Sequence, residues 1–239
     1  MIDAATSADL ARIAACERDV LGAYVPGFVP EASNAARPLR AVPAPDPLSV
    51  AAPQGAYFVN ANASGPPVFS RAGGFGIVEG ELRTADGRPV LGFALGDRKA
   101  LVPLRVDPYD LALGRVSDPG VAADGSFGYA RSAIDPRTGE RRTERVIVGR
   151  LALARFPAGT QPVRIDAIHV TPPAGVRALV GVPSDGNFAP LLPRARDLGG
   201  VDIVAGLEKM REAYEAFDAL RTAHQARGTI EKATLDLVK

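Results

Sequence analysis

The residue types that most often perform chemistry are few and widely spaced in this sequence. Its two histidines, His169 and His224, lie in different predicted elements, and neither has a second His or Cys at the spacing of metal ligands. The single cysteine, Cys16, forms no internal disulfide and lies in a predicted helix, where it resembles a small apolar side chain rather than a nucleophile. No Gly-x-Ser-x-Gly sequence marks the nucleophile of a hydrolase. These patterns predict a protein that is not an enzyme and holds no metal.

Two other patterns resemble ligand-binding motifs only superficially. Glycines are dense at residues 73–76, but no Lys-Ser or Lys-Thr pair follows, and the next segment has the pattern of a strand. A phosphate site needs backbone amides at the start of a helix, so we interpret this segment as a turn. Nearly all of the clustered aspartates lie beside Pro or Gly in predicted turns, and they lack calcium-loop spacing, so we expect no cofactor. These aspartates are Asp107, Asp110, Asp118, Asp124 and Asp135.

The overall charge and hydropathy exclude two classes of partner. Lys and Arg total 28 against 27 Asp and Glu, so no strong field of one sign attracts nucleic acid or an anionic membrane. No stretch approaches the roughly 18 apolar residues of a membrane span, so we expect no membrane insertion. Residues 1–10 lack a basic start before an apolar run, so we also expect no cleaved signal peptide.

The chain begins with a predicted helix and a proline-rich segment. Apolar residues between positions 7 and 22 fall near helical spacing, which predicts an amphipathic helix within a first region, residues 1–25. Seven prolines follow, and each removes a backbone donor, so residues 26–55 are predicted to be an extended linker. These prolines are Pro26, Pro30, Pro38, Pro43, Pro45, Pro47 and Pro53.

Residues 56–198 have the pattern of an antiparallel all-β domain. Short apolar runs alternate with turn sequences such as Ala-Asp-Gly-Arg at 85–88 and Ser-Asp-Gly-Asn at 184–187. Hydrophobic residues make up 46% of the chain but aromatic residues only 6%, so we expect a largely aliphatic core. The run at residues 146–156 is predicted to be one long core strand.

Residues 199–239 are predicted to form a C-terminal helix with a heptad-like seam. Its large apolar residues recur at steps of four and three from Ile203 to Phe217, as in short coiled coils. We expect the helix to kink at Gly228 or to restart near Thr229. The two end helices together predict an assembly interface made of Leu10, Ile13, Val20, Leu21, Ile203, Leu207, Met210, Tyr214 and Phe217.

The order of motifs in the β region resembles that of the bacterial flagellar rod and hook proteins. The sequence at 57–59 is similar to the family's Phe-Phe-x-Val strand, and residues 68–75 to its Tyr-Thr-Arg-x-Gly-x-Phe. Residues 80–92 are similar to Gly-x-Leu-Val-x-x-x-Gly-x-x-Val-x-Gly. Gly87 and Gly92 are expected to supply the positive backbone angle of turns.

Further blocks follow in the same order. Residues 121–127 and 148–157 resemble the family's Asp-Gly turn and its Gly-x-(Leu/Ile)-x-Leu-Ala-x-Phe strand, and residues 185–188 its Gly-x-Asn-x-Phe passage. The ends are similar more loosely, through Pro-Gly-Phe at 26–28 and Met-Arg-Glu-Ala-Tyr-Glu-Ala at 210–216. The family's Asn-rich segment before Gly-Phe is absent here.

The resemblance implies a structural subunit of the flagellar basal body. It implies a mainly β protein, with an antiparallel all-β domain flanked by N- and C-terminal α-helices that pack together in a polymer. Such a subunit would leave the cell by type III export without a cleaved signal peptide and join the axial filament of the periplasmic rod. Its partners would be itself, other rod or hook subunits and the surrounding ring proteins.

Two other interpretations stay open. The β domain could be a module that binds carbohydrate or a cell-wall component, or the chain could be an accessory rod-like paralogue. A binding module predicts an aromatic-lined groove, whereas Tyr57, Phe58, Phe69, Phe75 and Phe127 fall mostly at strand positions that a core would occupy. An enzyme would need clustered titratable groups that the sequence does not reveal.

Overall fold

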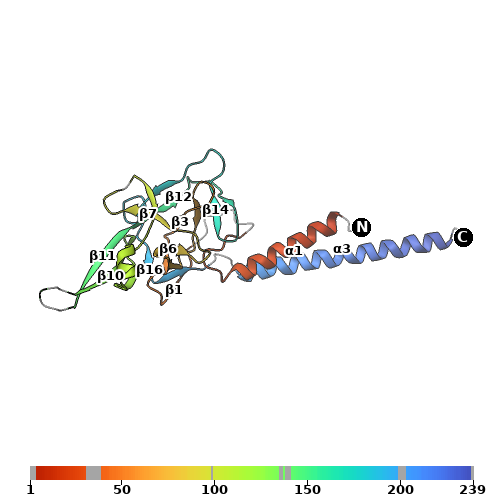
Figure 1. Ribbon diagram of the computed structural model, residues 1–239. Coiled ribbons are helices and arrows are strands. Elements are labelled where there is room, and N and C mark those ends of the chain that lie inside the picture. The colour runs from red at the N-terminus through yellow and green to blue at the C-terminus, as the bar shows by residue number, and fades with distance from the viewer. Residues whose placement is uncertain are drawn as a thin grey trace. The chain divides into compact units, whose positions relative to one another are not determined.

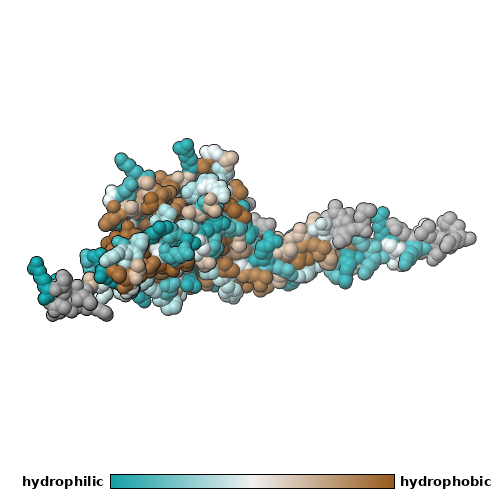
Figure 2. All heavy atoms as spheres, in the orientation of Figure 1, coloured by the Kyte–Doolittle hydropathy of each residue, from teal (hydrophilic) through white to brown (hydrophobic). Residues whose placement is uncertain are grey.

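The chain forms two compact units. A computed structural model describes residues 4–30, 39–97, 99–134, 137, 141–198 and 203–237. The helical unit combines Met1–Ala23 with Val201–Lys239, and the β unit is Tyr24–Gly200. Each unit shows polar and apolar side chains on its visible face (Figure 2). The predicted class is confirmed as mainly β with antiparallel sheets, while packing of the end helices in a polymer remains a proposal.

The β unit is built from short strands. The described strands are β1 (Ala41–Pro43), β2 (Val50–Ala51), β3 (Tyr57–Asn60), β4 (Val68–Ser70), β5 (Phe75–Val78), β6 (Glu81–Thr84), β7 (Leu91–Ala94), β8 (Leu101–Pro103), β9 (Val116–Val121), β10 (Ser126–Ile134), β11 (Arg141–Leu151), β12 (Leu153–Arg155), β13 (Val163–Arg164), β14 (His169–Thr171), β15 (Leu179–Gly181), β16 (Leu192–Pro193) and β17 (Ala195–Asp197).

Two larger sheets and three strand pairs make up the unit (Figure 1). One sheet has the order β8-β7-β11-β10-β9 and the other the order β13-β14-β4-β3-β12-β15. The remaining pairs are β1-β17, β2-β16 and β5-β6. All these pairings are antiparallel, which suits short strands joined by tight turns.

The predicted long strand at 146–156 is divided between the two larger sheets. β11 ends at Leu151, β12 begins at Leu153, and Ala152 is the point at which the chain passes from one sheet to the other. Leu151, Ala152, Leu153 and Ala154 are all fully buried. A continuous apolar run must be packed against other residues on both of its faces. Because the chain changes sheets at Ala152, neighbours from both sheets bury this run.

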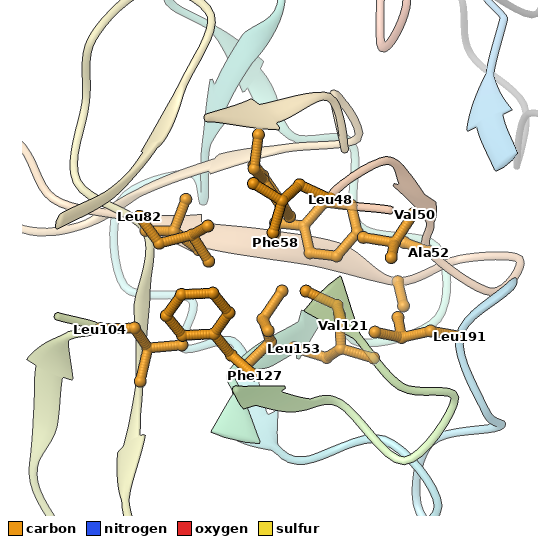
Figure 3. Close-up of a cluster of buried hydrophobic side chains, with 14 of the residues drawn as sticks. Leu48, Val50, Ala52, Phe58, Leu82, Leu104, Val121, Phe127, Leu153 and Leu191 are labelled. Atoms are coloured by element: carbon orange, nitrogen blue, oxygen red, sulfur yellow. The ribbon is translucent and has the colours of Figure 1, made fainter. Parts of the chain in front are cut away.

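Two hydrophobic clusters fill the β unit. The larger contains Phe58, Phe127 and Leu153, whose side chains point toward one another between layers of strands (Figure 3). The smaller contains Val59 and Phe69. Neighbours in a strand point to opposite faces, so Phe58 and Val59 of β3 belong to different clusters. The few aromatic side chains therefore lie inside a core that is otherwise aliphatic, as the composition predicts.

Part of the predicted linker lies inside the β unit. β1 pairs with β17, β2 pairs with β16, and Val50 is fully buried. Pro43 ends the three-residue strand β1 and Pro193 ends the two-residue strand β16, and a missing backbone donor is tolerated at such positions. The described residues from 39 to 55 are thus part of the body rather than a separate connector, whereas residues 31–38 lie outside the described part.

A buried ion pair lies where the first and last described segments of the β unit meet. The Arg71 Nε donates to Asp197 Oδ2 over 2.6 Å, and the side chains are 3% and 0% exposed. The Asp197 carboxylate also accepts from the Arg40 backbone N–H, while its backbone carbonyl accepts from the N–H of Gly27. Pro26 and Leu198 form an antiparallel bridge beside it. One aspartate therefore connects the first and last described segments of the unit.

A second buried polar contact holds the short helix α2 (Pro108–Ala112). Asp107 caps this helix by accepting from the Tyr109 backbone N–H, and Asp110, within the helix, is only 2% exposed. The Tyr129 hydroxyl donates to Asp110 over 2.6 Å. Burial, followed by this hydrogen bond, raises the pKa of Tyr129 to about 12. The contact fastens α2 to β10.

The helical unit consists of α1 (Ala4–Gly22) and α3 (Ile203–Leu237), which lie side by side and run in opposite directions (Figure 1). α3 continues through Gly228, so the expected restart at Thr229 is wrong. The Thr229 hydroxyl donates to the Gln225 carbonyl one turn earlier, a bond that a helical Thr commonly makes.

The two glycines of the β6–β7 motif have different roles. Gly87 has φ +85°, which confirms the expected turn conformation. Gly92 was expected to do the same, and this is wrong because it lies in β7 without a positive φ. A Cβ there would lie 2.3 Å from the Arg150 carbonyl oxygen and 2.9 Å from Leu104. Gly92 is needed for close approach of strands, not for a turn.

We expect Gly92→Ala to destabilise the β unit more than Gly87→Ala. The first forces a methyl group into a backbone carbonyl, at a cost of about 3 kcal/mol. The second strains only a left-handed residue in open space, at about 1 kcal/mol. Urea denaturation of both variants measures the difference, and equal losses would contradict these roles.

We expect Asp197→Asn to lower the free energy of unfolding more than the same substitution at an exposed aspartate. It leaves the buried Arg71 charge without its counter-charge, for which losses of about 3–5 kcal/mol are typical. Asp118→Asn is the matched control, because Asp118 is 75% exposed and lies 3.7 Å from Arg145, where ion pairs contribute roughly 0–1 kcal/mol. Equal denaturation midpoints for the two variants would show that the pair is dispensable.

Candidate assembly surface

The contact between α1 and α3 follows a three-four spacing on both helices. On α1 the buried or half-buried positions include Asp9, Ile13, Cys16 and Val20, and Ile13 is the most enclosed at 6% exposed. On α3 they include Ile203, Gly206, Met210, Ala213, Phe217 and Leu220. This spacing is that of a coiled-coil seam. We call this set of residues the seam.

Five of the nine predicted interface residues lie in the seam and four do not. The seam contains Ile13, Val20, Ile203, Met210 and Phe217. The other four are exposed, with exposed fractions of 43% for Leu10, 77% for Leu21, 46% for Leu207 and 45% for Tyr214. The structure thus separates one predicted stripe into a contact within the chain and a surface that faces water.

The seam residues of α3 that were not predicted from the sequence include two small ones. Gly206 and Ala213 occupy the seam between the larger residues, and Ala213 is 1% exposed. Sequence reasoning counted only large apolar residues, so it chose Leu207 and Tyr214, each one position beyond the true step. Small residues at alternate seam positions let two helices approach closely. A strict heptad template that accepted Gly and Ala would have found them.

One hydrogen bond places the exposed stripes of both helices on the same side of the pair. The Tyr214 hydroxyl donates to the Glu17 carboxylate, and this bond raises the pKa of Tyr214 above its usual value. Glu17 belongs to the α1 stripe that carries Leu10 and Leu21, since these residues are spaced at helical repeats. Tyr214 belongs to the α3 stripe of Val204 and Leu207. We call these stripes together the outer face.

The outer face is apolar and open to water. Its large residues are Leu10 and Leu21 on α1 and Val204, Leu207 and Tyr214 on α3, and Val204 is 67% exposed. Figure 2 shows apolar surface, in brown, where α1 lies beside α3. Groups of exposed apolar side chains on a two-helix unit are typical of an interaction site.

α3 is longer than its partner. It has 35 residues against 19 in α1, or about 52 Å against about 28 Å. Every residue from 221 to 230 is exposed, and so are 232–234, including Ile230 at 66%. We call residues 221–237 the overhang. In the described part of the chain, no other element covers it.

The glycine-rich segment at 73–76 and Cys16, which were considered as functional motifs, have structural roles. The Gly73 carbonyl accepts from the Val50 backbone N–H over 2.8 Å, which joins segments of the β unit. Cys16 lies half-buried in the seam. Among the described residues, no group of three His, Cys, Asp or Glu side chains is placed to hold a metal ion. No helix within the described ranges is long and apolar enough to cross a membrane.

The aromatic residues considered for a binding groove are core residues. Phe58 and Phe127 are fully buried, Phe69 and Phe75 are less than 10% exposed, and Tyr57 packs on Phe156. An open pocket of about 500 Å³ lies beside β7, lined by Phe93, Ala94, Leu95, Gly96, Asp97, Lys99, Arg150 and Val182. The Arg150 guanidinium lies 3.2 Å from the Asp124 carboxylate, so its charge is already compensated.

Ile13→Asp should separate α1 from α3, whereas Leu10→Asp should not. The first puts a carboxylate into the buried seam, which costs several kcal/mol, while the second leaves it in water. Circular dichroism at 222 nm during heating reports the helical unit of the full chain. Equal loss of helix in both variants would contradict the assignment of the seam.

No protein-family model and no curated protein matches the chain.

Proposed function

We propose that this chain is a structural subunit of an axial filament, and that it assembles through its helical unit. The observation that carries the proposal is the mismatch in length between the two end helices. α1 covers only the first half of α3, and the overhang is exposed throughout its described residues.

An uncovered helix of this length needs a partner to be stable. Isolated helices of about 15 residues are marginal in water, and most helical stability in proteins comes from packing. The overhang and the outer face could both be covered by neighbouring copies of the chain. A contact between two different surfaces of the same molecule joins copies head to tail, and it produces an open helical filament when the rotation between copies does not close into a ring.

The β unit supports the same division of roles. It encloses two hydrophobic clusters of its own, and its first and last described segments are joined by the Gly27 N–H to Asp197 carbonyl bond and the Pro26–Leu198 bridge. The unit therefore needs no partner to bury its core. A body that is complete by itself, combined with a helical unit that is incomplete, is the arrangement expected of a subunit that polymerises through its ends.

Within this proposal, the flagellar rod or hook is the filament that the order of sequence motifs favours. Several motif residues have structural roles that account for their presence. Arg71 is half of the buried ion pair, and Asp185 accepts from the backbone N–H groups of Val182, Asn187 and Phe188. The proposal includes type III export, a place in the periplasmic rod, and other rod or hook subunits and ring proteins as partners.

We expect a charge on the outer face to abolish assembly while the subunit stays folded. Leu10 and Leu207 are exposed, so Leu10→Asp combined with Leu207→Asp introduces carboxylates without disturbing the seam. In a filament the same charges would be buried without partners, at several kcal/mol each. The readouts are thermal unfolding of the monomer and rod incorporation, with motility, in cells that lack the native protein.

Lys209→Asp is the matched control, since Lys209 is exposed on α3 but outside the apolar stripe. Negative-stain microscopy of basal bodies from cells lacking the protein identifies the filament itself. A complete rod in those cells would reject the flagellar assignment. Normal assembly of the double variant would reject the outer face as the contact.

A further inference from the structure

His169 lies fully buried on β14 with its two ring nitrogens in unlike surroundings. Nδ1 is 2.8 and 2.9 Å from the two carboxylate oxygens of Asp166, three residues earlier. Nε2 is also buried, and it has no hydrogen-bond partner in the described part of the chain. The carboxylate oxygen Asp86 Oδ2 lies 3.7 Å from Nε2.

Asp86 belongs to the turn between β6 and β7, which is far from His169 in the sequence. Arg88 of the same turn donates to Asp86 over 3.0 Å and lies 3.6 Å from Asp166. It also donates to Asn62, which follows β3, over 3.4 Å. The turn and the segment before β14 are therefore already linked through Arg88, and His169 lies between their two carboxylates.

The protonation of Asp166 decides which nitrogen of His169 carries the hydrogen. Burial opposes ionisation of Asp166, but backbone donors at Ile168 and His169 and the His169 ring together lower its pKa. The ionised carboxylate accepts the Nδ1–H. In the neutral ring Nε2 then presents a lone pair to the Asp86 carboxylate. Two acceptors face each other, which explains why no hydrogen bond forms across the 3.7 Å.

We propose that His169 is a proton-operated latch between the β6–β7 turn and β14. When Nε2 takes a proton, the imidazolium donates from both nitrogens, one to Asp166 and one to Asp86. A movement of less than 1 Å brings Nε2 and Asp86 Oδ2 to hydrogen-bond distance. The latch closes in mild acid and opens when the proton leaves.

The other charged groups around the ring do not replace this link. Arg88 lies against the two carboxylates, and the Arg164 Nε donates to the Asp166 carbonyl oxygen while its guanidinium lies over Phe28. The strand on the other side, β4, presents the neutral Ser70 opposite His169. Of these charged groups, only the two carboxylates can accept a hydrogen bond from a ring nitrogen of His169.

Closing the latch would stabilise more than one turn. The Val29 backbone N–H donates to the Ala167 carbonyl over 2.9 Å, within the segment that precedes β14. Asp166 of the same segment holds His169. The latch therefore connects the β6–β7 turn, β14 and the N-terminal part of the β unit, which also contacts Asp197 through the backbone N–H groups of Gly27 and Arg40.

The pH window of the effect follows from the groups that titrate. The pKa values of Glu81, Asp124, Asp166 and Asp185 are all lowered, so these carboxylates stay ionised between pH 5.5 and 7.5. Histidine is the side chain that changes charge in this range. A folded state that binds a proton more readily than the unfolded state gains stability as pH falls. The β unit should therefore be more stable at pH 5.5 than at pH 7.5.

The test compares full-length wild type with Asp86→Asn, which removes the acceptor charge but keeps the size of the side chain. We expect the melting temperature of wild type to be about 2–4 °C higher at pH 5.5 than at pH 7.5. Asp86→Asn should lose most of this difference. Asp118→Asn should keep it because Asp118 is an exposed residue of β9, and His224→Gln should keep it because that histidine is exposed on α3.

Nitrogen-15 spectroscopy of the histidine rings gives an independent readout. His169 Nε2 should carry a hydrogen at pH 5.5 and lose it at pH 7.5. Hydrogen exchange in the 85–88 turn should slow on acidification in wild type but not in Asp86→Asn, after correction for the intrinsic pH dependence of exchange. An unprotonated Nε2 at pH 5.5, or an equal pH dependence of melting in wild type and Asp86→Asn, would overturn the latch.

Discussion

The buried ion pair between Arg71 and Asp197 is the constraint on which the β unit depends. Removing two charges from water is costly, and such a pair is retained where it fixes one arrangement against others. Here Asp197 also receives the Arg40 backbone N–H, and its carbonyl receives that of Gly27. The aspartate that neutralises Arg71 therefore also contacts the segment before β1 and the first described segment of the unit, beside the β1–β17 pairing and the Pro26–Leu198 bridge.

That closure explains how helices almost two hundred residues apart can pair. Because residues 26 and 198 form a bridge, the chain enters and leaves the β unit at neighbouring points. α1 and α3 then form a seam with three-four spacing, in which Ile13 and Ala213 are the most enclosed residues. The unequal lengths of the helices leave the overhang exposed, and this asymmetry is the physical basis of the proposed polymerisation.

The two units differ in how completely they bury their own apolar side chains. In the β unit the apolar clusters are closed, and the buried side-chain polar atoms without a hydrogen-bond partner belong, among the described residues, to Asn60, Arg71 and His169. In the helical unit, large apolar residues such as Leu21 and Val204 remain in water. The proposed filament subunit would need this contrast, because its body folds by itself while neighbouring copies cover the helical unit.

The sequence by itself determined the class of the chain, because turn residues and short apolar runs act locally. The Asp-Gly turn at Gly87, the aliphatic core with its buried aromatics and the large seam residues Met210 and Phe217 could all be read from it. Only the tertiary structure decided that Leu151 and Leu153 belong to different sheets, that Leu207 faces water while Ala213 is buried, and that His169 lies between Asp166 and Asp86. These outcomes depend on which distant segment covers each side chain, and spacing along one segment carries no information about that cover.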